Sequence, residues 1–377
     1  MGRWRHMGIV GLVATTLLTS GGCGRPADAS QHASAASLAP LLPVTTAADV
    51  RASDAALSAD LDTELASGRY ERVRSLIVLS HGRTVYERYF HSAPTDRHDV
   101  YSVSDSLIGL LVGIAIEDGL IDGVDQTLAA LLPDRAATMA PSLARATLLQ
   151  VLTDRAGLAD ELPAHSRTST GDELDALLAN PVATPGHFLY SANTARLLTA
   201  ILAHATGRSV LDYARDRLLT PLGIASTPFE QPAPWDARVI DGSRFSWTAD
   251  PPGGGFGSTG LRLTAHDLAK IGLLVLQDGR WEGRQVVPAQ WMRAATAPQV
   301  GTGTYQDGYG YQWWNMRTGG GEHVVFAAGA GMQAVLVVPA DRLVVAYQVW
   351  LPESGDSLAG GLMRELVAST VLPALAA

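Results

Sequence analysis

The residues best suited to chemistry stand at the start of the most apolar helical segment of the chain. Ser102 opens this segment, which runs to Leu120, and Asp105 follows three residues later. A serine followed at this spacing by an acid is a helix-capping pattern, with both side chains near the positive end of the helix. A serine hydroxyl in this position is also a candidate nucleophile when a base lies nearby. The pattern therefore leaves two interpretations open, a helix cap or an acyl-transfer site.

Composition limits the other chemistry that the chain can carry. Lys270 is the only lysine and Cys23 the only cysteine among the 377 residues, and the formal net charge is −9. One cysteine excludes a disulfide framework and a cysteine-based metal site, and no histidine pair has the His-x-x-x-His spacing of a zinc site. The glycines at 253–255 lack the Gly-Lys-Ser/Thr of a phosphate loop. An acidic chain also argues against a nucleic-acid partner. We expect no metal and no cofactor.

The first 23 residues have the pattern of a targeting signal. Arg3 and Arg5 precede an apolar stretch from Met7 to Leu18, and small residues lead to Cys23. This resembles a bacterial lipoprotein signal, in which the cysteine becomes the lipidated first residue; the alternative is a secretory signal with an incidental cysteine. Residues 24–45 are rich in Ala, Ser and Pro and read as a flexible linker. We expect an exported protein, anchored to the membrane of the cell envelope by a lipid on Cys23.

Strand patterns lie at both ends of the folded part, with a helical block between them. Helical spacing over residues 47–68 is followed by two strand-like runs at 75–80 and 84–90, joined by a tight turn. Three more runs follow at 323–328, 333–338 and 343–349, before a final helix over 357–372. We therefore predict an α/β fold with one antiparallel sheet flanked by the terminal helices. The sheet domain comprises residues 46–100 and 295–377, and residues 101–294 form an inserted, mainly helical domain.

Several long segments occur in an order that is typical of one family. They read YSVSDSLIGLLVGIAIEDGLI, PGHFLYSANTARLLTAIL, GGGFGSTGLRLTAHDLAKIG and FAAGAGMQAVLVVP. From about residue 47 to 370 the chain resembles the penicillin-recognising serine hydrolases, in the group related to class C β-lactamases, D-alanyl-D-alanine carboxypeptidases and family VIII esterases. The resemblance implies a β-lactamase/transpeptidase-like fold. It also implies acyl transfer through a serine at a helix N-terminus.

The resemblance assigns expected roles to particular residues. Ser102 takes the nucleophile position, and Tyr190 the position of the tyrosine that shares the proton traffic. The backbone N–H groups of Ser102 and Ala330 become the implied oxyanion donors. Ala328 and Gly329 line the opposite wall of the implied cleft.

The chain departs from the family pattern at the position of the catalytic lysine. The lysine of Ser-x-x-Lys is replaced by Asp105. A neighbouring anion disfavours ionisation of Ser102 and Tyr190, whereas a cation favours it. At roughly 4 Å and an effective dielectric constant near 20, each such interaction is worth about 4 kcal/mol. We therefore expect weak acyl-transfer catalysis.

Other motifs are altered as well. Ala192 stands where the family has the asparagine of Tyr-x-Asn, with Asn193 one place later. The third motif, Ala327-Ala328-Gly329, lacks Lys, His and Thr. Asp154, Arg155 and Ala156 replace residues of a Leu-Leu-Thr-His-Thr-Ser-Gly loop.

Several groups are candidates for the missing lysine's work. One hypothesis is that Asp105 itself acts as a base, through Tyr190 or water. A second is that Arg155 pairs with Asp105 and fills the vacated cation site. His187 and His323 are candidate bases, although an ordinary surface role explains both.

These observations predict an exported, β-lactamase-related serine hydrolase. It would act on small esters or amides by acyl transfer at Ser102, weakened by Asp105. The alternative is a catalytically inactive binding protein for a cell-wall peptide or another small ligand. An accessible Ser102 hydroxyl near Tyr190 and an N–H pair favours the enzyme, and a capped or buried Ser102 favours the binding protein.

Overall fold

The two ends of the folded part meet in one seven-stranded antiparallel sheet. β1 (Val73–Ser80) pairs with β2 (Arg83–Tyr89) across the predicted tight turn and with β12 (Leu343–Val349) from the other end of the chain. The strand order is β2-β1-β12-β11-β10-β9-β8. The remaining strands are β8 (Gly308–Tyr309), β9 (Trp314–Arg317), β10 (His323–Ala328) and β11 (Ala334–Val338). The predicted antiparallel sheet and α/β class are confirmed.

The computed structural model describes residues 52–160, 173–230, 241–242, 244–247, 260–303, 306–350 and 365–373. The predicted signal peptide (1–23), with Cys23, and the linker (24–45) lie outside these residues. So does the glycine run at 253–255. Within the described ranges, no helix is both long and apolar enough to cross a membrane.

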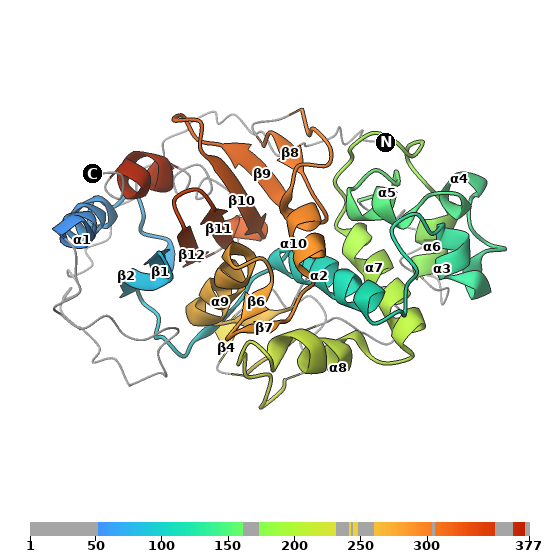
Figure 1. Ribbon diagram of the computed structural model, residues 1–377, viewed down its shortest axis with the longest axis horizontal. Helices are drawn as coiled ribbons and strands as arrows, with labels where there is room; N and C mark the ends of the chain where they lie inside the picture. The colour runs from blue at the N-terminus through green and yellow to red at the C-terminus, as the bar shows by residue number, and fades with distance from the viewer. Residues whose placement is uncertain are drawn as a thin grey trace, which may run out of the picture. The chain divides into compact units, whose positions relative to one another are not determined.

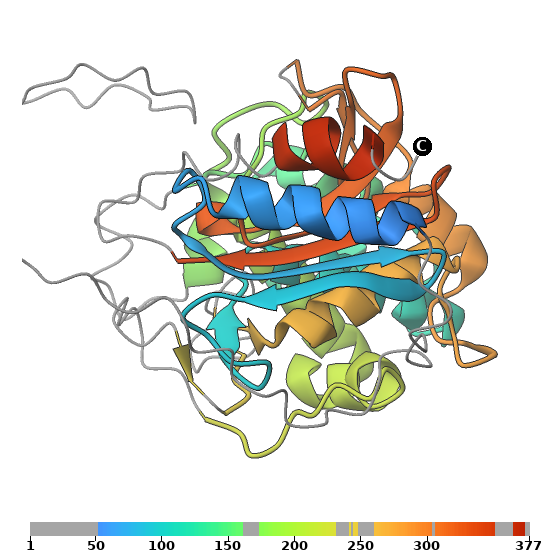
Figure 2. The same ribbon diagram turned by 90° about the vertical axis from the view of Figure 1, so that its left-hand side faces the viewer.

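The central strands are buried on both faces, which explains why their sequences are nearly all apolar. Successive residues of β1 alternate between two cores: Leu76 and Val78 join one, and Ile77 and Leu79 the other. The first core is completed by α1 (Ala52–Leu65) and by the C-terminal helix, which is described over residues 365–373. Figure 2 shows these two helices side by side over the sheet. The terminal helices therefore cover one face, as predicted.

The other face of the sheet is covered by α9 (Ala265–Leu276). Gly272 permits a very close approach, because a Cβ there would lie 2.4 Å from Val344 Cγ1 and 2.7 Å from Val335 Cγ2. A capping box between Thr264 and Asp267 begins this helix. Residues 265–276 thus pack on the sheet, although they fall in the range expected for the helical domain. The domain boundaries remain a prediction.

The helical block is built around α2 (Val103–Glu117), the predicted apolar helix. Gly113 lies so close to the Trp291 ring of α10 (Ala289–Thr296) that a Cβ would approach it to 2.2 Å. A helix that is apolar on all sides belongs at a core, and α2 contacts both α7 (Asn193–Thr206) and the sheet (Figure 1). The other short elements are α3 (Leu128–Leu131), η2 (Pro133–Arg135), α4 (Pro141–Ala144), α5 (Leu148–Leu152), α6 (Glu173–Ala179), α8 (Val210–Ala214), η4 (Arg215–Leu219), η5 (Ala330–Met332), β3 (Arg97–Asp99), β4 (Asp241–Gly242), β5 (Arg262–Leu263), β6 (Arg280–Trp281) and β7 (Arg284–Gln285).

Candidate active site

Ser102 occupies the N-cap position of α2, but its side chain does not cap the helix. The first turn is closed by the backbone, where the Asp105 N–H donates to Ser102 O at 3.1 Å, and the Ser102 hydroxyl makes no capping bond. Ser102 is half-buried. The interpretation of Ser102 and Asp105 as a side-chain capping pair is therefore wrong. The hydroxyl faces other groups instead.

Tyr101, the residue before Ser102, has a strained backbone conformation that is stabilised by the Asp99 side chain. Tyr101 has a φ of 49°, in the left-handed region that bulky residues rarely adopt. Asp99 accepts the Tyr101 N–H at 2.8 Å through one oxygen and the Gly260 N–H at 3.0 Å through the other. Asp99 thus fixes the sharp turn that presents Ser102.

The end of β10 lies directly against the N-terminus of α2. A Cβ on Gly329 would lie 2.1 Å from Val100 O and 2.9 Å from the Ser102 nitrogen, so only glycine fits here. Ala330, exposed to solvent, follows immediately. Among the described residues, neither the Ser102 N–H nor the Ala330 N–H has a hydrogen-bond partner. Two free N–H groups beside a serine hydroxyl have the chemistry of an oxyanion hole, and that role stays a prediction.

Asp105 and Tyr190 meet at Ser102. The Tyr190 hydroxyl donates to Asp105 Oδ2 at 3.3 Å. The Ser102 hydroxyl lies near enough to both groups to lower the pKa of each. Burial raises the pKa of Tyr190 well above its ordinary value, and the nearby Asp105 charge adds to this effect. Tyr190 therefore remains a phenol at neutral pH and acts here as a donor.

A second buried acid, Asp154, lies near enough for its charge to act on Asp105. It follows α5, accepts a short hydrogen bond from the Thr194 hydroxyl of α7, and is also bonded by Tyr309. Burial raises its pKa to about 8. Burial also raises the pKa of Asp105 well above its ordinary value, and the Asp154 charge raises it further.

The acid pair is closed off from water. Asp105 is 3% exposed and Asp154 is 2% exposed. Asp105 Oδ1 and Asp154 Oδ2 are buried without a hydrogen-bond partner. Sequence analysis noted Asp154 only as a substitution in a loop motif and gave it no role. Its position, one place after the Leu-Thr that begins that motif, was the available signal.

Among the described residues, no cation replaces the missing lysine. The hypothesis that Arg155 pairs with Asp105 is wrong, because its Nε donates to Thr153 Oγ1 at 2.8 Å and the described residues include no ion pair between the two. The side chain of Arg155 is held by its own loop. Lys270 lies on α9 and donates to Gly223 O at 2.7 Å. Neither carboxyl therefore has a counter-ion among the side chains that the structure describes.

Three further residues are not directed at Ser102 by any contact in the described part of the chain. Asn193 donates to the backbone oxygens of Ala159 and Asp160 at 2.7 and 2.9 Å, so it holds a loop in place. His323 Nε2 is hydrogen-bonded to Asn315 Oδ1 at 2.7 Å. His187 is exposed. In the described part of the chain no three His, Cys, Asp or Glu side chains gather as a metal site.

An aromatic wall adjoins the acids. The Trp314 ring lies 4.6 Å from that of Tyr309 and 5.5 Å from that of Tyr190, and the Phe188 ring lies 5.3 Å from Tyr309. Trp313, by contrast, is fully buried in the core. Acidic and aromatic side chains thus gather around Tyr190.

The fold and the serine at the start of α2 define a serine-hydrolase-like protein of the β-lactamase/transpeptidase class. The β-lactamase family profile matches residues 29–366. The chain belongs to the β-lactamase family, and the resemblance found in its sequence is confirmed.

Individual relatives agree with this assignment. The chain is 28% identical over 298 residues to a 6-aminohexanoate-dimer hydrolase of Paenarthrobacter ureafaciens, covering 71% of each chain. The structure is similar to a β-lactamase from Sulfitobacter sp. EE-36, with a TM-score of 0.61 and 20% identity over 85% of this chain and all of that one. It is also similar to the octameric penicillin-binding protein homologue from Pyrococcus abyssi, with a TM-score of 0.62 and 19% identity over 84% and 77% of the two chains.

Proposed function

We propose that this protein hydrolyses small esters or amides by acyl transfer at Ser102, slowly at neutral pH and faster as the pH rises. The observation that carries the proposal is the uncapped, half-buried Ser102 hydroxyl, near Asp105 and Tyr190 and beside two backbone N–H groups that have no partner among the described residues. A relative named for hydrolysis of a 6-aminohexanoate dimer supports a hydrolytic reaction.

The proposed reaction uses Asp105 as the base. Ser102 Oγ attacks the carbonyl carbon and gives its proton to the Asp105 carboxylate, while the Ser102 and Ala330 N–H groups bind the oxyanion. The tetrahedral intermediate then collapses, and Asp105 returns the proton to the leaving alcohol or amine. Water attacks the acyl-serine in the second half, with Asp105 taking one proton and Ser102 regaining it.

The pH dependence follows from the burial of the acids. A carboxylate whose pKa is raised is a stronger base than an ordinary one, but fewer molecules carry it in ionised form at neutral pH. Tyr190 stays a phenol and stabilises the charge on Asp105 by donating to it. Turnover therefore increases with pH as Asp105 ionises.

The walls of the site favour substrates without a carboxylate. Ala327 and Ala328 occupy the strand segment beside Gly329, and neither offers a charged or hydroxyl group. The two acids add negative charge, which repels an anionic substrate. We propose neutral esters or amides, rather than β-lactams, as substrates.

A second function is favoured by one observation. The buried acids have no counter-ion among the described side chains, so a site in which both remain protonated could not deprotonate Ser102. The protein would then be an inactive binding protein for a cell-wall peptide or another small ligand.

A serine-reactive probe distinguishes the two functions. A fluorophosphonate should label the wild type and Ser369→Ala, an exposed control serine on the C-terminal helix, but not Ser102→Ala. Turnover of a chromogenic ester should rise from about pH 6 to about pH 10. Asp105→Asn should abolish it, and Asp105→Lys should raise it at neutral pH. Absence of both labelling and turnover in the wild type would support the binding protein.

We also propose that the protein is exported and held at a membrane by a lipid on Cys23, a residue outside the described part. The basic start, the short apolar stretch and the cysteine support this. In a bacterial host, the wild type should sediment with membranes, and Cys23→Ser should lose both the lipid and the membrane association. Equal sedimentation of the two proteins would contradict the anchor.

A further inference from the structure

We propose that Gln333 is a positioning residue for the Ala330 N–H group, the second of the two implied oxyanion donors. The Gln333 side chain fixes the loop at residues 329–333 to the last residue of β12. The loop in turn holds Ala330 beside the N-terminus of α2. This role rests on the proposed function, since it explains what keeps one of the donors in place.

The loop at residues 329–333 joins β10 to β11. The Gly329 N–H donates to Gln333 O at 2.8 Å, which closes the loop. Within it, Gly331 has a φ of 69°, a left-handed conformation that glycine adopts readily, so the chain turns sharply after Ala330. Ala330 is exposed, and its N–H has no partner among the described residues. The direction of this N–H therefore depends on how the ends of the loop are held.

The Gln333 side chain bonds both backbone groups of Val349, the last residue of β12. Its Nε2 donates to Val349 O at 2.6 Å, and its Oε1 accepts the Val349 N–H at 3.0 Å. The regular pairing between β11 and β12 ends two residues earlier, at Ala334 and Tyr347. The glutamine amide thus takes the place of the backbone that β11 would supply if it continued along β12.

This replacement takes place in a buried part of the sheet. Gln333 is 2% exposed and Val349 is 4% exposed. A buried N–H or C=O group without a partner is costly, so the Gln333 amide allows the loop to leave the sheet towards Ser102. A Cβ on Gly329 would lie only 2.9 Å from the Ser102 nitrogen. A small movement of the loop therefore changes the geometry of the two donors.

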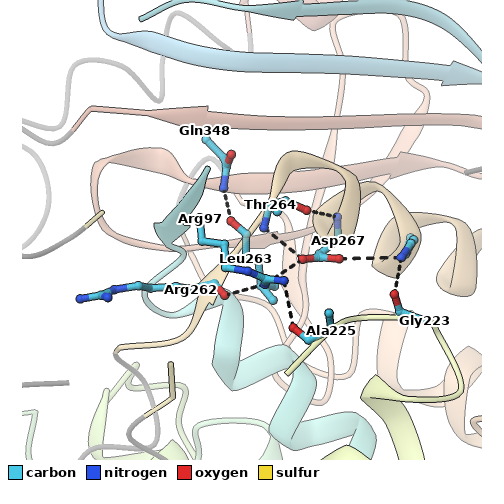
Figure 3. A network of polar contacts seen from close by, with 9 residues as sticks. Arg97, Gly223, Ala225, Arg262, Leu263, Thr264, Asp267 and Gln348 are labelled. Atoms are coloured by element: carbon cyan, nitrogen blue, oxygen red, sulfur yellow. Dashed lines mark hydrogen bonds and ion pairs between the residues drawn. The ribbon is translucent and has the colours of Figure 1, made fainter. Parts of the chain in front are cut away.

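A second buried glutamine provides a matched control. Gln348 is 1% exposed, accepts the Ser75 hydroxyl at 3.0 Å and donates to Leu263 O at 2.9 Å (Figure 3). These side-chain bonds lead away from the loop. Removal of either glutamine side chain leaves buried polar groups without a partner, but only the removal of Gln333 releases the loop.

Gln333→Leu tests this role in turnover. With one oxyanion donor displaced, kcat for a chromogenic ester should fall about 100-fold while KM stays within about threefold, because the donor acts in the transition state. Gln348→Leu should lower stability in urea to a similar degree and leave kcat within about threefold of wild type. Equal losses of kcat in the two variants would overturn the proposal, as would a loss in Gln333→Leu that appears only in KM.

Gln333→Glu keeps the test decisive if Gln333→Leu does not fold. When protonated, the introduced carboxyl can make both bonds to Val349, and when ionised it has no donor for Val349 O. Its turnover should be within about threefold of wild type at about pH 6 and at most about one tenth of wild type at about pH 10. A ratio to wild type that does not change with pH would also overturn the proposal.

Amide hydrogen exchange separates this role from the proposed function. The Gly329 N–H should exchange at least about tenfold faster in Gln333→Leu than in the wild type, and at the wild-type rate in Gln348→Leu. If this holds while the wild type shows no serine-dependent turnover, the proposed function fails and the positioning of the loop stands. If Gly329 exchanges at the wild-type rate in Gln333→Leu, the positioning fails.

Discussion

Two clusters bury acidic side chains, one with cations beside the carboxylate and the other without any among the described residues. In the first, Arg97 donates to Asp267 at 3.1 Å and to Ala225 O at 2.9 Å, and Asp267 also accepts the Thr264 N–H at 3.1 Å (Figure 3). Lys270 lies 3.8 Å from the same carboxyl. Both Asp267 oxygens thus face a cation, and the cluster ties β3 to the start of α9.

The second cluster contains Asp105 and Asp154, and no described side chain supplies it with a cation. Its two unpartnered oxygens are a local conflict that folding alone does not explain. Such conflicts are tolerated where they serve a reaction, and this one lies near Ser102 at the N-terminus of α2. The comparison teaches that a buried carboxylate paired with a cation holds the fold together. A buried carboxylate without a cation indicates a functional site.

The largest expected effect is on the paired cluster. Asp267→Ala leaves the buried Arg97 without its counter-charge, which should lower the free energy of unfolding by about 3–5 kcal/mol in urea denaturation. Asp105→Asn removes a charge that had no partner and should change stability by less than about 1 kcal/mol at neutral pH. Asp278→Ala, which breaks an exposed ion pair with Arg293, is the control at about 0–1 kcal/mol. Equal losses at Asp267 and Asp105 would break the comparison.

The next prediction tests whether the close approach of Gly329 to Ser102 is needed for the reactivity of that serine. Gly329→Ala forces a Cβ against Val100 O and the Ser102 nitrogen, so it should destabilise the fold by about 1–3 kcal/mol and abolish serine labelling. Gly319→Ala, which meets nothing within 4 Å, should leave both unchanged. Labelling at the wild-type rate in Gly329→Ala would show that the close approach is not needed.

The pH dependence of stability sharpens the comparison further. Since burial raises the pKa of Asp154 from 3.8 to about 8, the folded chain holds this proton more tightly than the unfolded chain. Between about pH 4 and pH 8, stability should therefore fall as pH rises, by up to about 1.4 kcal/mol per pH unit, and then level off. Asp154→Asn should remove this contribution. Parallel stability curves for the two proteins across that window would contradict it.

The smallest effect is at the tyrosine. Tyr190→Phe deletes the 3.3 Å donor to Asp105, which should lower turnover at neutral pH about fivefold and move its rise to higher pH. The measurement is a pH–rate profile. A shift to lower pH would show that Tyr190 opposes, rather than assists, ionisation of Asp105.

Much of this fold is readable from the chain. The strands of the hairpin and of the C-terminal half are apolar runs bounded by turn residues, and they pair as predicted because strand patterns are local. The convergence of Ser102, Asp105 and Tyr190 was also predictable, from the order of motifs. The orientation of single side chains was not, as Asn193, Arg155 and the uncapped Ser102 show, because competing hydrogen bonds decide it.

The sequence by itself determined which side chains are available: a serine before an apolar helix, an acid three residues later, and one lysine, placed on the helix that supports the sheet. Only the tertiary structure decided that the charge of Asp154 reaches Asp105, because this depends on how α2, α5 and α7 pack together. It also decided that both acids are closed off from water, since burial is a property of the whole core. The pKa of a carboxyl depends on its surroundings, and these are formed by residues from several segments of the chain.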